Sequence, residues 1–291
     1  MTPDAEPPRQ PGPPRGSALY YSLRFLPHDR RQAAGAVYEV IGALEQATAG
    51  VREPAVARTK LAWWREELQR LYDGRPRHPT TQALRPWLGR YTLPAEYFLE
   101  ILAGVEMDLE RVRYPSFRDL RLYCQHRGAN AALLVSEVFG YTDAHTPRFA
   151  QAVGVAQCLS RLLHGIRDDA RAGRIHVPAD ELQRFGVDPG DLLLPQTGDR
   201  VRGLLQFQLE RVREQYRHAL TLLPSSDRLS QHPFLVQIAL DRALLDEMQR
   251  DGLGLLERRV ELPVLRRLWI AWRTVQRTRR RAGRSRATAD S

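Results

Sequence analysis

The sequence predicts an all-α protein. Apolar residues recur three and four residues apart along most of the chain, as they do on the buried face of a helix. Proline and glycine separate these periodic segments at positions where helices ordinarily begin and end. No stretch shows strict apolar and polar alternation over the length of a strand. The chain has 291 residues without a linker-like segment in its middle, so we expect one helical domain with a substantial core.

The two ends of the chain are expected to lie outside this domain, which we place at residues 17–276. Residues 1–16 are rich in proline, lack the apolar stretch of a secretory signal and are predicted to be a disordered leader. Residues 277–291 are predicted to be a basic, disordered tail. No apolar run reaches the ~18 residues of a membrane span, so we expect a cytoplasmic protein.

The first half of the chain divides into helical segments at recognisable start and stop signals. An aromatic segment precedes the first long helix, which ends before Gly50, and Gly74 ends the second. Pro94 lies in the first turn of the fourth segment. Ser116 and Asp119 form a capping pattern at the start of the fifth. The predicted helices span residues 28–48, 53–72, 80–91, 94–111 and 116–138.

The second half continues the helical pattern around one long central segment, residues 154–178. Its apolar positions follow helical spacing and lead into a loop that contains Gly173 and Pro178. Residues 178–200 are rich in proline, glycine and aspartate and are expected to form a loop. The remaining predicted helices span residues 201–223, 233–251 and 263–278.

The charge distribution predicts an anionic partner. The formal net charge is +10, and a run of arginines over residues 277–286 directly follows an apolar segment that contains Trp269 and Trp272. This combination over residues 265–286 is typical of a contact with an anionic membrane surface, here the inner face of the cell membrane. The alternative is a last core helix with a solvated tail. We expect no nucleic acid partner, because the basic run has no interleaved aromatic residues and no binding motif.

Five segments, in a fixed order, resemble the squalene/phytoene synthase family. They are SALYYSLRFLPHDRR, KLAWWREEL, GVEMDLERVRYPSFRDLRLYC, DARAGRIHVPADELQRFGV and LRRLWIAWR. The likeness covers residues 17–273 and is greatest to the presqualene diphosphate synthases of the bacterial hopanoid pathway. The resemblance implies an isoprenoid-synthase fold, which is a helical bundle around a central cavity.

The same resemblance implies a chemistry. Active members of the family join two farnesyl or geranylgeranyl diphosphates head to head, and two aspartate-rich motifs on opposing helices hold Mg²⁺. Hard cations with oxygen ligands neutralise the leaving diphosphate. A dry cavity shields the carbocation from water.

The first of these motifs is largely replaced in this chain. Where the family has three acids, the chain has Glu45, Gln46 and Ala49. Gly42 occupies the position of an arginine that binds diphosphate in the family. One acid of three is therefore retained.

The second motif is similarly altered. The family has an asparagine and two aspartates at four-residue spacing, whereas this chain has Arg161, Gly165 and Asp169. The neighbouring Asp168 would point about 100° away from Asp169 on a regular helix. Glu45, Asp169 and Asp168 are thus the metal candidates, and they would hold at most one Mg²⁺.

Four residues remain as candidates for binding or chemistry. Tyr123 and Asp169 are the catalytic candidates, and Arg161 and Arg174 are the candidates for binding a diphosphate. Alternatively, Tyr123 is a packed helix residue, and Asp168, Asp169, Arg171 and Arg174 belong to a structural ion-pair network that fixes the helix end. The histidines show no zinc spacing and are expected to be solvated or packed.

Three hypotheses of function follow. The first is a catalytically degenerate paralogue that binds a prenyl diphosphate or lipid, or that partners an active synthase. The second is an active Mg²⁺-dependent head-to-head prenyl transferase with unconventional ligands on a locally unwound helix. The third is a peripheral membrane interaction protein whose cavity is filled by side chains.

Overall fold

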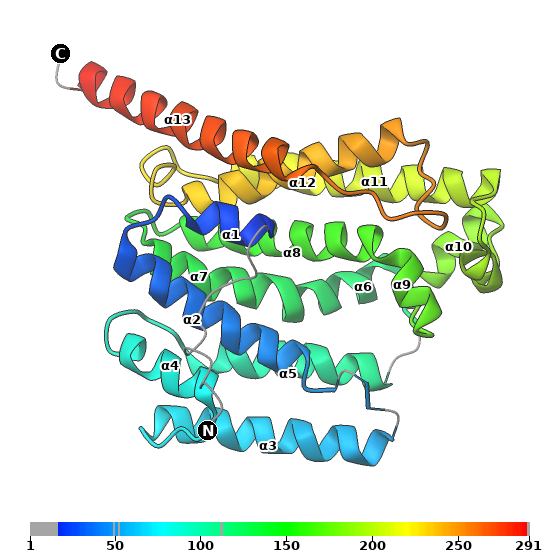
Figure 1. Ribbon diagram of the computed structural model, residues 1–291, viewed down its shortest axis with the longest axis horizontal. Helices are drawn as coiled ribbons and strands as arrows, with labels where there is room; N and C mark the ends of the chain where they lie inside the picture. The colour runs from blue at the N-terminus through cyan, green and yellow to red at the C-terminus, as the bar shows by residue number, and fades with distance from the viewer. Residues whose placement is uncertain (1–16, 49, 52, 111–112, 290–291) are drawn as a thin grey trace, which may run out of the picture.

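The computed structural model describes residues 17–289 except 49, 52, 111 and 112 (Figure 1). Across this part of the chain the regular secondary structure is helical, and the single β-bridge pairs Arg113 with Ile175. The elements are α1 (Ala18–Leu23), α2 (His28–Glu45), α3 (Pro54–Tyr72), α4 (Pro79–Leu88), α5 (Ala95–Glu110), α6 (Phe117–Cys124), the π-helix η1 (Gln125–Ala129), α7 (Asn130–Phe139), α8 (Thr146–His164), α9 (Ile166–Arg171), α10 (Ala179–Phe185), the 3₁₀-helix η2 (Pro189–Leu193), α11 (Asp199–Thr221), α12 (His232–Arg250) and α13 (Val264–Ala289). The all-α prediction is confirmed.

Helix α8 lies at the centre of the bundle. It packs against α11, η1 and α7, while α2 packs against α4, α5 and α7, and α3 packs against α5. In Figure 1 the long helices form a stack with α3 at one side and α13 at the other. One large apolar core joins these helices, and a second, smaller cluster attaches α13 to α1 and α12 through Ala271, Val275, Val236 and Tyr21.

Two predicted helices are each divided in two. The segment 116–138 is interrupted by the π-helix η1, which lets the chain continue from α6 to α7 with an extra residue in the turn. The central helix begins earlier than predicted, at Thr146, and breaks at Gly165, so Asp169 lies on a separate short helix.

Two predictions of irregular structure are wrong. Residues 178–200 contain α10 and η2 rather than a plain loop. The expected disordered tail is helical up to residue 289, because α13 continues without a break through the arginine run. The expected leader, residues 1–16, lies outside the described residues.

The backbones of η1 and α8 touch at two glycines. A Cβ atom added to Gly128 would lie 2.2 Å from the carbonyl oxygen of Gly154, and one added to Gly154 would lie 2.2 Å from that of Gly128. No side chain fits between the two segments at this point. The crossing fixes η1, and with it Arg127, against the middle of α8.

In the described part of the chain, every helix is either too short or too polar to cross a membrane.

Candidate functional site

Three helices end at the same place and bring charged side chains together there. Glu45 is the last residue of α2, Asp108 lies in the last turn of α5, and Arg161 lies in the last turn of α8. Helix carboxyl ends carry partial negative charge, which disfavours carboxylates and favours cations. The two acids therefore need compensating positive charge at this site.

Two arginines supply that charge to Glu45. Its Oε1 atom lies 3.1 Å from Nη2 of Arg127 and 3.5 Å from Nη1 of Arg161. The side chain of Arg127 is only 5% exposed, whereas that of Arg161 is 50% exposed. The single acid retained from the first motif is thus bound by arginines from η1 and α8.

Arg127 also links Glu45 to a second acid, Asp108. Its Nη1 atom donates to Oδ2 of Asp108 at 2.7 Å, and the hydroxyl of Tyr123 donates to the same oxygen at 3.2 Å. Burial raises the pKa of Asp108, but the hydrogen bond to His176 and the charge of Arg127 outweigh it and hold the pKa below its ordinary value. Burial raises the pKa of Tyr123 far above its ordinary value, so its hydroxyl remains a donor.

His176 connects Asp108 to Asp169. Its Nε2 atom lies 3.5 Å from Oδ1 of Asp108, and its Nδ1 atom lies 3.4 Å from Oδ2 of Asp169. The ring stacks on Tyr114, with centroids 5.9 Å apart. Burial lowers the pKa of His176, but the two carboxylates outweigh burial and raise it above 6.5. The imidazolium form thus bridges the two acids.

Local backbone pairing explains the position of His176. The β-bridge between Arg113 and Ile175 brings the strand-like segment after α9 beside the segment after α5, and Ala179 N donates to the carbonyl of Tyr114 at 2.8 Å. His176 therefore lies beside Tyr114, against which it packs.

Asp169 and Asp168 face different partners. Asp169 accepts a hydrogen bond from Arg174 at 3.0 Å, and this contact and His176 lower its pKa although burial raises it. Asp168 lies at the surface, with Oδ2 at 3.6 Å from Nη1 of Arg259. The predicted divergence of the two neighbouring acids agrees with these contacts, and Asp168 is outside the charged network.

Arg161 is held from two sides. Besides Glu45, its guanidinium donates to Sγ of Cys158 at 3.7 Å. A hydrogen bond with Cys124 and the charge of Arg161 lower the pKa of the Cys158 thiol, whereas burial raises it. Together the first two effects are the larger, and the pKa is about 6. The guanidinium is therefore fixed at the position where the family has a neutral asparagine.

The residues present do not fit a magnesium cluster. Mg²⁺ takes oxygen ligands in near-octahedral geometry and usually keeps several of its waters. Here Glu45, Asp108 and Asp169 each already contact a guanidinium or an imidazole. Over the residues that the structure describes, no three acidic, histidine or cysteine side chains are grouped so as to hold a metal ion. The neighbouring arginines would repel a divalent cation.

A small apolar pocket adjoins the network. Asp169, Arg174 and His176 lie at its polar end, and Leu159, Leu162 and Leu163 line the remainder together with neighbouring apolar residues. Its volume is about 30 Å³, which is room for one or two water molecules. One end of the pocket is charged and the rest is apolar, which suits a ligand with an anionic head group and an apolar chain. Its volume, however, is too small to hold a farnesyl group.

Sequence reasoning placed Glu45, Tyr123, Arg161, Asp169 and Arg174 at the site, and the structure brings all five into one neighbourhood.

Sequence reasoning missed Asp108, Arg127 and His176. The ring of His176 is packed against Tyr114, which is one of the two expected alternatives, and it also bridges two carboxylates. Glu106 pairs with Arg65 on α3 while Asp108 faces the network, as their two-residue spacing predicts. No local pattern marks the three missed residues, because their contacts cross between separate elements.

Comparisons with solved structures establish the class of fold. A dehydrosqualene synthase superposes with a TM-score of 0.80 at 18% identity, covering 90% of this chain and 92% of its own. The squalene synthase HpnC from Alicyclobacillus acidocaldarius gives a TM-score of 0.70 at 24% identity, covering 80% and 88%. The bundle is therefore an all-α fold of the isoprenoid-synthase type.

Sequence comparisons then give the family. The chain is 28% identical over 263 residues to a phytoene synthase of Arthrospira platensis, and 30% identical over 265 residues to the 15-cis-phytoene synthase of Synechococcus elongatus. Each alignment covers 86% of this chain and 85% of the relative. The squalene/phytoene synthase family model matches residues 14–266. The chain belongs to the squalene/phytoene synthase family, a family of isoprenoid metabolism.

Proposed function

We propose that this chain is a catalytically degenerate member of its family, which binds a prenyl diphosphate without Mg²⁺ and does not ionise it. The observation that carries the proposal is the pair of arginine contacts to Glu45. Arg127 and Arg161 place fixed cations where the family's two acidic motifs would face one another across a metal cluster.

Arginine at this site supports binding rather than chemistry. The side chains of Arg161 and Arg174 are 50% and 47% exposed, and a guanidinium group can donate two parallel hydrogen bonds to phosphate oxygens. Interactions that are equally strong in the ground state and the transition state do not raise the rate of a chemical step. A diphosphate held in this way would be bound without being activated as a leaving group.

The apolar chain of the ligand would enter the leucine-lined pocket beneath the network. Since that pocket has a volume of about 30 Å³, binding requires Leu159, Leu162 or Leu163 to move aside. An active synthase would need a larger rearrangement, because Glu45 must leave two arginines and Asp168 must leave Arg259.

Calorimetric titration with a non-hydrolysable farnesyl diphosphate analogue tests the proposal. We expect the wild-type protein to bind equally well, within about twofold, in buffer with millimolar Mg²⁺ and in buffer with a chelator. The double variant R161Q/R174Q should weaken binding by at least about 100-fold, since each charged hydrogen bond contributes about 1.5–3 kcal/mol and every 1.4 kcal/mol is a factor of ten. Arg171→Gln is the control, because this exposed arginine lies on α9, three residues before Arg174 in the sequence.

Two outcomes would overturn the proposal. Binding that requires Mg²⁺, with release of diphosphate from farnesyl diphosphate, would establish an active synthase. Absence of binding in both buffers would mean that side chains fill the interior of the bundle and that the protein acts as an interaction scaffold.

A further inference from the structure

Helix α13 carries a concentrated positive charge. Residues 264–282 contain seven arginines and no acidic residue. At its amino-terminal end, Arg266 pairs with Glu247 and Arg267 with Glu261. The ion pairs to carboxylates thus lie at the amino-terminal end of α13, whereas Arg277 and Arg280 in its second part form none within the described residues.

The outer face of the same helix is apolar over its first turns. Leu265 is 79% exposed, Trp269 is 52% exposed and Trp272 is 51% exposed. These positions are spaced three and four residues apart and thus share one face. A different face, about 100° around the helix, is buried, with Ala271 and Val275 in the small cluster against α1 and α12. The side chains of Trp269 and Trp272 therefore face solvent, while α13 stays packed against α1 and α12.

A groove with a volume of about 570 Å³ runs beside the basic part of α13. Its apolar lining includes Leu235 and Ile238 of α12. Its basic lining consists of Arg228, Arg242, Arg277, Arg280 and Arg281.

Within the described residues, none of Arg228, Arg242, Arg277 and Arg280 forms an ion pair with a carboxylate. Burial and the nearby charge of Arg281 lower the pKa of Arg228. Cations gathered in this way are stabilised by an anion in the groove.

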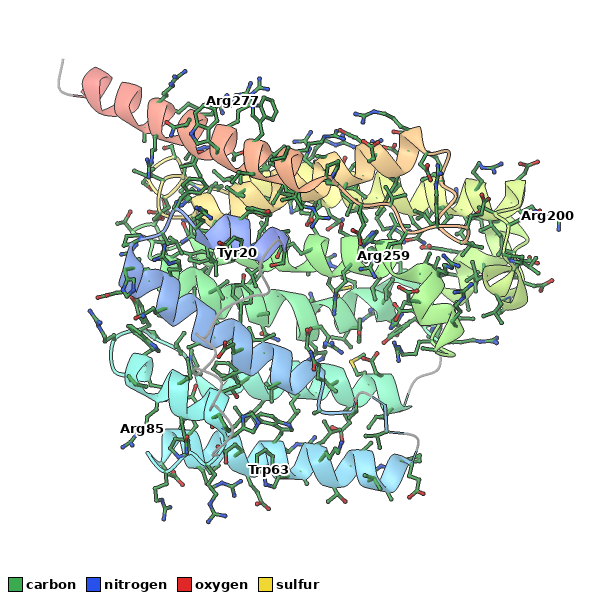
Figure 2. The ribbon with its side chains drawn as sticks, viewed as in Figure 1. Tyr20, Trp63, Arg85, Arg200, Arg259 and Arg277 are labelled. Carbon is green, nitrogen blue, oxygen red and sulfur yellow. The ribbon has the colours of Figure 1, made fainter. Side chains whose placement is uncertain are left out.

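We propose that α13 docks the protein on an anionic phospholipid bilayer, with Trp269 and Trp272 at head-group depth and lipid phosphates in the arginine groove. Aromatic side chains with one polar edge favour the membrane interface, and clustered arginines bind anionic head groups. Trp63, which is also exposed, has no comparable cluster of arginines beside it in the described part of the chain. Trp63 on α3 lies beside Arg70, which is already paired with Glu66 and Glu67, and Figure 2 shows Trp63 and Arg277 on opposite sides of the molecule.

Vesicle flotation of the full chain tests this proposal. We expect the wild-type protein to float with phosphatidylcholine vesicles that contain about one-third phosphatidylglycerol, and not with pure phosphatidylcholine. The double variant R277Q/R280Q should lower partitioning at least about tenfold, since each basic residue near the surface contributes several-fold. The matched control R58Q/R85Q removes two exposed arginines from α3 and α4 and should leave partitioning unchanged.

The aromatic contribution is tested separately. The double variant W269A/W272A should lose quenching of tryptophan fluorescence by brominated lipids, whereas Trp63→Ala should retain it. Circular dichroism of each variant reports whether the helices have formed.

Inorganic phosphate distinguishes a free anion from a lipid phosphate. Release of the protein from vesicles by millimolar phosphate at constant ionic strength would assign the groove to a soluble anion and overturn membrane docking. Wild-type protein that fails to float, or equal losses in R277Q/R280Q and R58Q/R85Q, would also overturn it. Dissociation of an oligomer by W269A/W272A without any change in flotation would assign the face to a protein partner instead.

Discussion

Glu67 on α3 lies completely inside the protein and is nevertheless ionised. It accepts hydrogen bonds from the backbone N–H groups of Arg77 at 2.7 Å and His78 at 2.8 Å, from the hydroxyl of Thr81, and from Arg70 at 2.9 Å. Burial raises its pKa, but these donors outweigh burial and lower the pKa from 4.5 to about 2. This single carboxylate therefore joins α3 to the start of α4.

We expect Glu67→Gln to lower the free energy of unfolding at neutral pH by about 2–4 kcal/mol, because a shift of one pKa unit corresponds to about 1.4 kcal/mol. The pKa is depressed in the folded state, so the contribution of Glu67 is complete above pH 4.5 and is lost as the pH falls towards 2. Urea unfolding at several pH values should show the two proteins converging in acid. Glu66→Gln is the control, since this exposed carboxylate also contacts Arg70 and should cost at most ~0.5 kcal/mol. Equal effects of both substitutions would contradict this account.

At the scale of elements, the contact between η1 and α8 positions the site. Gly128 precedes the start of α7 by two residues and faces Gly154 in the middle of α8, with the two backbones in direct contact. Arg127 is the neighbour of Gly128, so the close approach of the backbones delivers its guanidinium to Glu45 and Asp108.

Gly128→Ala is expected to lower the free energy of unfolding by about 3 kcal/mol or more, at the upper end of overpacking effects, because its Cβ would meet a backbone carbonyl that cannot rotate away. Gly42→Ala provides the opposite case. No atom lies within 4 Å of a Cβ added there, and replacing glycine inside helix α2 should stabilise the protein by about 0.5–1 kcal/mol. Thermal unfolding of both variants is the measurement. A Gly128→Ala protein as stable as wild type would show that the two segments are not in contact.

At the scale of the whole molecule, the helical architecture could be predicted from the sequence because its signals are local. Apolar periodicity, Pro94 in a first turn and Gly74 after a helix end each act within a few residues. The break at Gly165 was not predicted, since glycine is tolerated in helices and tertiary contacts decide whether the chain bends. The helical tail was missed because its composition alone resembles a disordered segment.

The candidate site could be predicted only where a residue occupies a motif position. Glu45, Arg161 and Asp169 were located in this way. Arg127 joins the network through Glu45 of α2 and His176 through Asp108 of α5, both distant in sequence, and no periodicity encodes such pairings.

The charged network also links the stability of the whole molecule to pH. The pKa of His176 is raised above 6.5, so its contribution to folding is complete below pH 6.5 and is lost as the pH rises through the folded-state value. The pKa values of Asp108 and Asp169 lie below 3.8, so their contribution is complete above pH 3.8 and is lost as the pH falls further. The network therefore stabilises the fold most strongly between about pH 3.8 and pH 6.5.

His176→Gln should reduce the free energy of unfolding by about 2–4 kcal/mol near pH 5.5, because it leaves two half-buried carboxylates without their shared cation. The cost should shrink as the pH rises through the raised pKa of His176, where the wild-type imidazole becomes neutral. His164→Gln is a control of opposite sign. Burial lowers the pKa of His164, so protonation favours its unfolded state and the cost of that substitution should grow with pH. Urea unfolding of both variants across this range measures the two slopes, and parallel slopes would mean that His176 does not bridge Asp108 and Asp169 in solution.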